Sequence, residues 1–384
     1  MSWQDQYAAA LMNTFGTPPR EFVRGEGVWL TDRDGRRYLD LLGGIATNAL
    51  GHAHPHFVAA ISEQAATVSH VSNLFTSAQQ IALGSRLAGL LGHQTRVFLC
   101  NSGTEANEAA FKLTRRTGRS RIVAAEDGFH GRTMGALTVT HKPAYREPFA
   151  PLAGEVTFVP YGDATALAAA VDESVAAVVL EPIQGEAGVV VPPAGYLAAA
   201  RQITTDVGAL LWLDEVQTGV GRTGAWFDHS REQLVPDLVT LAKGLGNGFP
   251  IGACLATGTA GELFQPGMHG TTFGGNPLAA RAALTVLDLL EPLLPQIVRT
   301  GDWLAQALTG LPAVAAVHGR GLLRGVELSE PIGPALVAVA LEAGFVLNAP
   351  RLNRIRIAPP LIITPADLEP FVRAWPGLVQ AARR

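Results

Sequence analysis

The feature that most constrains the fold is the alternation of short apolar runs with helical stretches between residues 58 and 256. Runs rich in Val, Leu, Ile and Ala, bounded by turn residues, predict seven strands at 97–100, 121–125, 156–160, 175–180, 209–213, 238–241 and 252–257. Helical periodicity predicts helices that include 79–91, 105–117, 164–171 and 194–207. Such alternation is typical of a doubly wound, mostly parallel sheet in an α/β protein.

The character of the chain changes near residue 276. Long Leu- and Ala-rich helices follow, then short strands near 321–328 and 354–357, and a final helix after Thr364. We expect a large domain at residues 46–275, a smaller α+β domain at 276–384, and an N-terminal segment, residues 1–45, that packs with the small domain. A length of 384 residues allows two or three such units.

Composition and charge exclude several classes of protein. With 48% hydrophobic and 16% charged residues, the chain does not have the composition of a disordered protein. A net charge of −4 without a basic patch argues against a nucleic-acid or anionic-membrane partner. The chain starts without a basic, apolar leader, and its apolar runs are shorter than the roughly 18–20 residues that cross a bilayer. We therefore expect a soluble, cytoplasmic protein. Cys100 and Cys254 are isolated, and we expect both to be buried.

Lysine is scarce, which limits the candidates for amine chemistry. The chain has only Lys112, Lys142 and Lys243. Lys243 follows the apolar strand at 238–241 and precedes a Gly-rich loop. Desolvation there would lower its pKa and give a nucleophilic amine able to form a Schiff base. Lys112 lies in a predicted helix beside arginines and Lys142 precedes a proline, so we expect both to be exposed.

Polar residues after other predicted strands add candidate site residues, because ligands bind beyond the carboxyl ends of parallel strands. Ser102 and Glu105 have the spacing of a capping box, and the helix start behind them suits a phosphate, although an ordinary capped helix has the same signature. Asp214 ends an apolar strand and needs a cation, either a protonated ring nitrogen of a cofactor or an arginine. Phe129 suits stacking on a flat cofactor and Arg132 suits a carboxylate, the alternative being a polar loop with a buried Phe.

Two further patterns point to other chemistry. Residues 219–224 match the dinucleotide fingerprint G-x-G-x-x-G, but residues 225–228 do not continue as a helix, which argues against nucleotide binding. His52, His54 and His56 surround Pro55 without a carboxylate or cysteine pattern, so we expect a structural turn and no metal site.

Taken together, these segments resemble the class III, or ω-, aminotransferases, which depend on pyridoxal 5′-phosphate. Residues 211–227, 236–237 and 241–252 resemble nearly the whole class signature, and 101–107, 128–133, 181–188, 270–277 and 355–361 follow the expected order. Within the class the chain is most similar to acetylornithine aminotransferases. The resemblance implies fold type I of the pyridoxal-phosphate enzymes. It also implies transfer of the δ-amino group of N2-acetylornithine to 2-oxoglutarate, which gives N-acetylglutamate 5-semialdehyde and glutamate in arginine biosynthesis.

The resemblance also implies roles for single residues. Lys243 would bind the cofactor as a Schiff base and move the substrate proton, and Asp214 would keep the ring nitrogen protonated. The remaining cofactor contacts would be Phe129 and Val216 on the ring faces, Gln217 at the ring oxygen, Ser102, Gly103 and Thr104 at the phosphate, and Thr272 at the phosphate of a neighbouring subunit. This last contact implies a homodimer with shared active sites.

For the substrate, the resemblance assigns Arg132 to the distal carboxylate and makes Glu186 and Arg356 a switchable pair that opens for glutamate. Thr271 would lie near bound acetylornithine. Ile45 stands where ornithine aminotransferases have a tyrosine, which favours an acylated amine. Other ω-aminotransferases, acting on ornithine, 4-aminobutyrate, succinylornithine or succinyldiaminopimelate, and aminomutases remain alternatives. So do a nicotinamide dehydrogenase and a non-catalytic binding protein.

Overall fold

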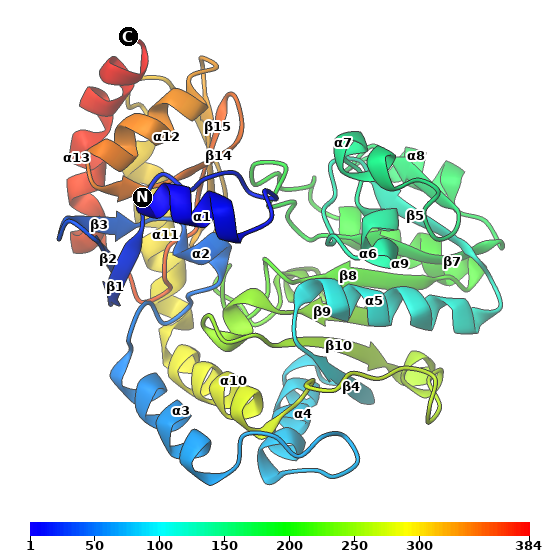
Figure 1. Cartoon of the computed structure of the whole chain (residues 1–384). Coiled ribbons are helices and arrows are strands. Elements are labelled where there is room, and N and C mark those ends of the chain that lie inside the picture. Colours follow the sequence, from blue (N-terminus) through cyan, green and yellow to red (C-terminus); the bar gives the residue numbers. More distant parts are fainter.

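A seven-stranded sheet forms the core of the larger part of the molecule, on the right in Figure 1, in a computed structural model that describes residues 1–384. The strands lie in the order β4-β10-β9-β8-β7-β5-β6. Their bounds are β4 (Thr95–Cys100), β5 (Arg121–Ala125), β6 (Val156–Val159), β7 (Val175–Leu180), β8 (Leu210–Asp214), β9 (Leu238–Leu241) and β10 (Gly252–Thr257). Neighbours from β9 to β6 are parallel. The predicted mostly parallel α/β sheet is confirmed.

Strand β10 runs against the others and pairs antiparallel with both β9 and β4. The chain joins β9 to β10 through residues 242–251. A parallel return needs a crossover of a dozen or more residues, so this shorter connection lets the chain only turn back beside β9. Lys243 lies at the start of that connection.

Helices cover both faces of the sheet because alternate side chains of each strand point to opposite sides. Ile122 and Ala124 of β5 pack with α5 (Gly103–Thr114) and α6 (Met134–Val139). Val123 and Ala125 pack with α8 (Ala164–Ala170) and α9 (Tyr196–Val207). Every residue of β7 is buried, as expected for a central strand.

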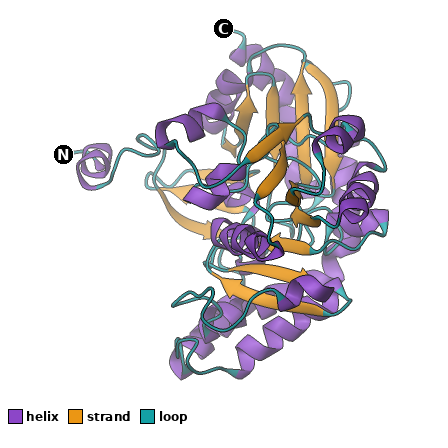
Figure 2. Ribbon diagram, turned by 90° about the vertical axis from the view of Figure 1, so that its right-hand side faces the viewer, coloured by secondary structure: helices purple, strands orange, loops and turns teal.

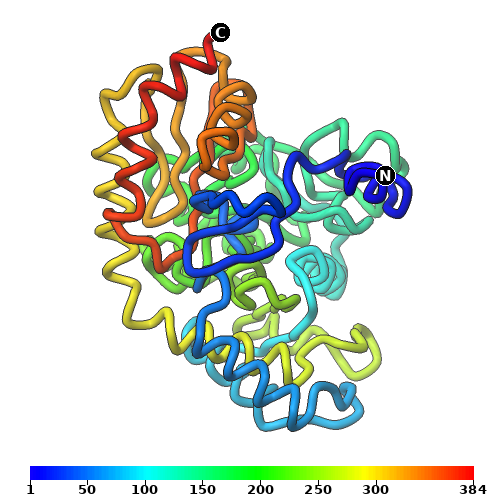
Figure 3. Tube along the Cα trace, turned by 60° about the vertical axis from the view of Figure 1, so that its left-hand side comes forward, coloured from blue at the N-terminus to red at the C-terminus, as the bar shows by residue number.

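The N-terminal region forms a second sheet with a strand from near the other end of the chain. Helix α1 (Trp3–Ala10) buries no residue and projects from the body of the molecule (Figure 2). The sheet order is β1-β2-β3-β13, with β1 (Phe22–Glu26), β2 (Trp29–Asp32), β3 (Arg37–Asp40) and β13 (Phe345–Val346). Leu39 pairs in parallel with Phe345, so an early strand lies beside a late one, although the two termini themselves stand apart (Figure 3).

A third sheet and a set of helices complete the C-terminal part. The sheet order is β11-β12-β15-β14, with β11 (Val314–Arg320), β12 (Leu323–Leu328), β14 (Asn348–Arg351) and β15 (Arg354–Ile357). The helices here are α10 (Pro277–Leu290), α11 (Leu294–Leu308), α12 (Gly333–Glu342) and α13 (Pro365–Ala382). Helix α10 packs on α3 (Pro55–Thr67) and α4 (Ala78–Leu91). One apolar cluster extends from Leu241 of β9 through Val286 to Trp375. This cluster joins the large sheet to the C-terminal helices. We propose the domain division at residues 45 and 275.

The short elements are α2 (Gly43–Ala46), α7 (Pro143–Arg146), η1 (Arg115–Thr117), η2 (Glu147–Phe149), η3 (Asp228–Glu232), η4 (Lys243–Gly246), η5 (Gly258–Glu262) and η6 (Glu291–Leu293). Cys100 and Cys254 are buried free thiols, as the sequence predicts. His52 places Nε2 2.9 Å from Asp40 Oδ2, so this histidine of the His-rich turn makes a contact within the fold. None of the helices combines the length and apolarity needed to span a bilayer.

Candidate active site

Loops that follow five strands of the large sheet meet at one cavity of about 400 Å³. The cavity lies beyond the carboxyl ends of the parallel strands, where such sheets bind ligands, and its size suits a small molecule. The predicted residues that line it are Ser102, Gly103, Thr104, Phe129, Arg132, Glu186, Asp214, Val216, Gln217 and Lys243. Asn107, His130 and Glu181 line it as well, although sequence reasoning assigned them no role.

Asp214, at the end of β8, is 3% exposed and accepts three hydrogen bonds. Its Oδ2 accepts hydrogen bonds from Asn107 Nδ2 and His130 Nδ1, both at 2.8 Å, and its Oδ1 accepts from the Val216 N–H at 3.0 Å. An arginine partner, one alternative from the sequence, is absent. Burial disfavours a charged His130, but the hydrogen bond and the charge of Asp214 outweigh it and raise the pKa of His130.

The sequence places these two partners near other candidate residues but does not link them to Asp214. Asn107 stands one helical turn after Gly103, so it shares the face of α5 that points to the strand ends. His130 lies between Phe129 and Arg132, two residues that the sequence already marks as candidates. Asn107 and His130 each have one buried polar atom without a hydrogen-bond partner, Oδ1 of Asn107 and Nε2 of His130. The polar groups behind Asp214 are therefore not all satisfied by the chain itself.

Lys243 opens the short helix η4 with a φ of 43°, a left-handed conformation that a non-glycine residue adopts at a cost. Burial lowers the pKa of Lys243, although the charge of Glu186 opposes the shift. The other two lysines are exposed, as predicted. Lys112 Nζ donates to the Met268 carbonyl at 3.0 Å, and Lys142 Nζ lies 4.6 Å from the centre of a tyrosine ring. Lys243 is thus the one lysine that lines the cavity.

The start of α5 leaves backbone donors open at the cavity. Ser102 caps the helix, its Oγ accepting from the Glu105 N–H at 3.2 Å and its carbonyl from the Ala106 N–H at 3.0 Å. The predicted capping box is only half formed. The Glu105 carboxylate accepts instead from the backbone and side-chain N–H groups of Asn101, which together offer it two donors where Ser102 offers one. The N–H groups of Gly103 and Thr104 remain for a ligand.

A side chain at position 103 would not fit this cradle. A Cβ on Gly103 would lie 2.8 Å from Val216 Cγ1, well inside van der Waals contact. Glycine therefore brings the helix start and Val216 close together at the same wall of the cavity.

Glu181 follows β7 as Asp214 follows β8, and the same strand-end reasoning would have found it. Its Oε1 accepts from the Phe129 N–H at 3.0 Å and its Oε2 from the Gly185 N–H at 3.2 Å. Burial raises the pKa of Glu181 to about 7. The carboxyl group joins the loop that carries Phe129 to the loop that carries Glu186.

Glu186 and Arg356 form the ion pair that the resemblance implies. The Arg356 side chain is 1% exposed, whereas that of Glu186 is 34% exposed. Burial alone would raise the pKa of Glu186, but the charges of Arg356 and Lys243 outweigh it and lower that pKa. Gln217 joins the pair by accepting from Arg356 Nη1 at 3.1 Å. Arg132 makes no ion pair within the chain, and its guanidinium lies 3.4 Å from the centre of the Tyr145 ring.

Thr271 and Thr272 do not line the cavity that holds Lys243. Thr271 Oγ1 accepts from Asn101 Nδ2 at 3.1 Å, and Thr272 lines a separate hollow with His70 and Asn73. Arg356 does not line the cavity either, but it reaches the lining residue Glu186, as Thr271 reaches the lining residue Asn101. Of the predicted site residues, Thr272 therefore lies farthest from a role within its own chain.

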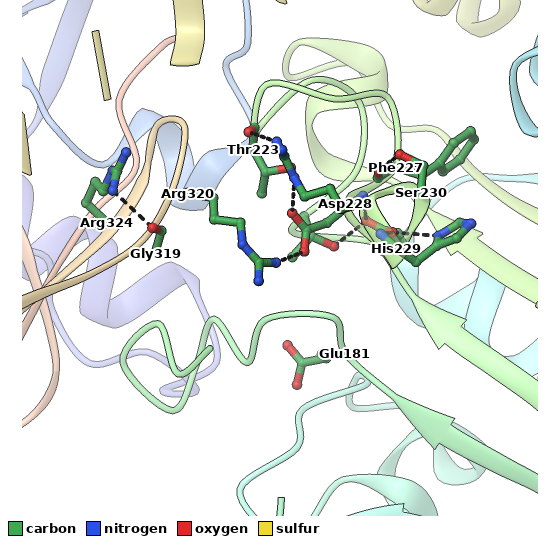
Figure 4. A network of polar contacts seen from close by, with 12 residues as sticks. Glu181, Thr223, Phe227, Asp228, His229, Ser230, Gly319, Arg320 and Arg324 are labelled. Carbon is green, nitrogen blue, oxygen red and sulfur yellow. Dashed lines mark hydrogen bonds and ion pairs between the residues drawn. The ribbon is translucent and has the colours of Figure 1, made fainter. Parts of the chain in front are cut away.

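A buried polar cluster adjoins Glu215, the residue after β8, and Figure 4 shows its members Asp228, His229 and Arg320. Glu215, next to Asp214, accepts from the backbone N–H groups of Asp228 and His229, both at 3.0 Å. The Asp228 carboxylate in turn lies 2.5 Å from Arg320 Nη1 of β11. The cluster ties the strand that carries Asp214 to the third sheet.

The glycine-rich segment 219–224 also connects the loop after β8 to the C-terminal part of the chain. Arg222, which is 2% exposed, donates from Nη1 to the carbonyl oxygens of Leu322 at 3.1 Å and Pro359 at 2.5 Å. Burial lowers the pKa of Arg222 to about 9. No α-helix begins after this run, and the short 3-10 helix η3 follows instead. The geometry of a dinucleotide loop is therefore missing.

Comparison with known proteins gives a family match and relatives of similar sequence. The chain matches the family Aminotransferase class-III over residues 13–375. It is 55% identical to the acetylornithine aminotransferase of Mycolicibacterium smegmatis, covering 100% of this chain and 99% of that protein. It is 54% identical to that of Streptomyces coelicolor, covering 98% and 95%.

Solved structures of aminotransferases also match the fold of this chain. The ornithine aminotransferase of Toxoplasma gondii ME49 matches with a TM-score of 0.94 at 30% identity, covering 100% of this chain and 96% of that one. The N-acetylornithine aminotransferase of Stenotrophomonas maltophilia K279a matches with a TM-score of 0.84 at 34% identity, covering 97% and 99%.

Proposed function

The chain belongs to the class III aminotransferases, and from this premise we propose that it moves the δ-amino group of N2-acetylornithine to 2-oxoglutarate. The products are N-acetylglutamate 5-semialdehyde and glutamate. One observation carries the proposal: a shielded lysine, Lys243, faces the same cavity as a buried carboxylate, Asp214. Proteins named for this activity are 51–56% identical to the chain over nearly its whole length, which supports the choice of substrate.

The residues present fit pyridoxal 5′-phosphate. The open N–H groups of Gly103 and Thr104, with the Ser102 side chain, suit the phosphate at a helix start. Phe129 and Val216 offer apolar surface to the ring, and Gln217 lies in reach of the cavity. Asp214 accepts three hydrogen bonds and a carboxylate has about four acceptor sites, so one acceptor position remains for a protonated ring nitrogen. When bound, the group supplies an electron sink for the carbon that loses its proton.

The chain's own groups handle the proton. A depressed pKa leaves a larger share of Lys243 as the neutral amine near pH 7, the form that can bind a carbonyl carbon and take a proton from the substrate carbon. Asp214 stays an acceptor because His130 and Asn107 donate to it, and it thereby holds a proton on the ring nitrogen. Half-burial of Lys243 limits access of water to the amine.

Two arginines provide for the substrate carboxylates. Arg132, free of ion pairs, suits the carboxylate of acetylornithine, whose reacting amine lies at the other end of the molecule. Arg356 is neutralised by Glu186, and movement of the partly exposed Glu186 side chain would release it for the α-carboxylate of glutamate. Ile45 is apolar and 42% exposed, so it offers no hydrogen bond to a free α-amine.

We propose a homodimer with shared active sites, in which Thr271 and Thr272 act at the cavity of the partner. Their position outside the cavity of their own chain supports this arrangement. Nearby Phe273 is 60% exposed and its ring lies 5.2 Å from that of His70. An exposed aromatic side chain next to Thr272 suits contact with a second copy of the chain.

Lys243→Ala tests the mechanism, with Lys112→Ala as the matched control at an exposed lysine. Wild type and control loaded with pyridoxal 5′-phosphate should absorb in the visible and lose that absorbance on addition of acetylornithine. Lys243→Ala should show neither. If Lys243→Ala retains the visible band and turnover, the assignment is wrong. Faster conversion by ornithine than by acetylornithine would overturn the substrate.

A further inference from the structure

Arg356 has a third polar partner besides Glu186 and Gln217. Its Nη2 donates to Asn348 Oδ1 at 2.9 Å. Since a guanidinium has only donors, the amide of Asn348 must present its oxygen here. Neither the sequence motifs nor the signature residues of the site include Asn348.

Asn348 differs from the other two partners in where it is anchored. It lies on β14 directly opposite Arg356 on β15, as a pair in the antiparallel ladder. Glu186 and Gln217 come from loops of the large sheet, and Glu186 is partly exposed. If Glu186 moves, Asn348 stays in place because it belongs to the same sheet as Arg356.

Asn348 is also uncharged. With Glu186 in contact, the buried guanidinium has one carboxylate partner. With Glu186 displaced, Asn348 and Gln217 still accept hydrogen bonds but leave the positive charge of Arg356 uncancelled. Nη1 contacts Glu186, which lines the cavity, so when Glu186 moves away Nη1 keeps only Gln217 and can take a carboxylate from a ligand.

From these contacts, and resting on the proposed function, we propose that Asn348 is a positioning residue that sets substrate choice at Arg356. It holds Nη2 so that Nη1 alone alternates between Glu186 and the α-carboxylate of glutamate. Acetylornithine uses the paired state of Arg356 and therefore depends less on Asn348.

Asn348→Asp tests this role, and Asn353→Asp is the matched control. Asn353 is exposed in the turn between β14 and β15. The Asn353→Asp substitution therefore adds the same negative charge nearby, without contact to Arg356. An aspartate at position 348 would neutralise Arg356 permanently and compete with the glutamate carboxylate. We expect the KM for glutamate to rise about 10- to 100-fold, the effect of losing one hydrogen bond to a charged group. The KM for acetylornithine should rise at least tenfold less.

Two measurements on the cofactor-loaded protein decide the matter. The first is the KM of each half-reaction, followed with glutamate and with acetylornithine separately. The second is the Kd for glutarate by calorimetry, which reports carboxylate binding without turnover and should weaken together with the glutamate KM. Equal changes of both KM values, or an Asn348→Asp protein that behaves like Asn353→Asp, would overturn the role of Asn348.

Failure of the proposed function looks different, because the wild-type protein would then fail to convert acetylornithine or would convert ornithine faster, and the role of Asn348 would be overturned with it. If Asn348→Asp does not fold, Asn348→Ala takes its place. It should still raise the glutamate KM and the glutarate Kd selectively, because Nη2 loses its anchor. An unselective effect in Asn348→Ala overturns the proposal.

Discussion

Replacing Glu181 with glutamine should change how the stability of the protein depends on pH. Burial raises the pKa of this carboxyl group from 4.5 to about 7. Between these two values the folded protein keeps the proton on Glu181 whereas the unfolded chain has lost it. The folded state therefore binds more protons, and the free energy of unfolding falls as the pH rises through this window.

The size of the effect follows from the same two values. Each pH unit of the window contributes about 1.4 kcal/mol, so the full shift is worth roughly 3 kcal/mol. Glutamine cannot ionise, so the free energy of unfolding of the variant does not fall in this way as the pH rises. It also loses one backbone hydrogen bond, since Glu181 accepts from both Phe129 and Gly185, but that cost is independent of pH. Relative to wild type, Glu181→Gln should therefore gain roughly 3 kcal/mol between pH 4.5 and 7.5.

The assay is urea unfolding followed by tryptophan fluorescence across that range, at one protein concentration and without added cofactor. Glu215→Gln is the matched control. Burial disfavours the charge on Glu215, but the His229 contact and further hydrogen bonds outweigh it and lower the pKa of Glu215. The ionised Glu215 stabilises the wild-type protein above the pKa it has in the unfolded chain, and this stabilisation is lost as the pH falls. The Glu215→Gln control should therefore be less stable than wild type near neutral pH, and this difference should shrink at acidic pH. A stability difference for Glu181→Gln that stays constant with pH would refute the reasoning.

Three other substitutions or reactions test the site and the core. Gly103→Ala should weaken cofactor binding about tenfold while the melting temperature stays within a few degrees, because the new methyl group displaces Val216; unchanged binding in a cofactor titration would contradict the close approach. His130→Ala should cost about 2 kcal/mol in urea unfolding, because buried Asp214 loses a donor, and a neutral effect would show that the histidine contributes little. Cys100 should resist iodoacetamide at pH 8 until the protein unfolds, since burial raises the pKa of its thiol to about 12; rapid labelling of native protein, seen by mass spectrometry, would be the contrary result.

Strands of the large sheet were predictable because their signal is local. A run such as Val175–Leu180 is apolar throughout since both faces of β7 are covered, and its neighbours in sequence are turn residues. Periodicity identifies β10 as a strand but says nothing of its direction, which depends on the short connection after β9. The pairing of Leu39 with Phe345 had no local signal, since two residues of β13 complete a sheet begun far away in the chain.

The site divides in the same way. Asp214 and Lys243 stood out because each follows an apolar strand. The partners of Asp214, by contrast, come from a helix and a loop elsewhere in the chain. Only the folded sheet brings Asn107 and His130 within 2.8 Å of one carboxylate oxygen. Asn348 was missed for the same reason, since its role depends on a register between two strands.

The pairing of β3 with β13 bears on how the chain is made. On a ribosome, the N-terminal strands emerge early, but the backbone partners of Leu39 and Leu41 are the carbonyl groups of Gly344 and Val346. At about 5–20 residues per second, the wait between them is roughly 15–60 s. During that time the edge of β3 is unpaired and open to other chains, and it stays so even after the last strand of the large sheet, which ends at Thr257, has been made. Slow translation and premature termination upstream of residue 344 should therefore favour aggregation, and a chaperone that shields this edge would act on the nascent N-terminus.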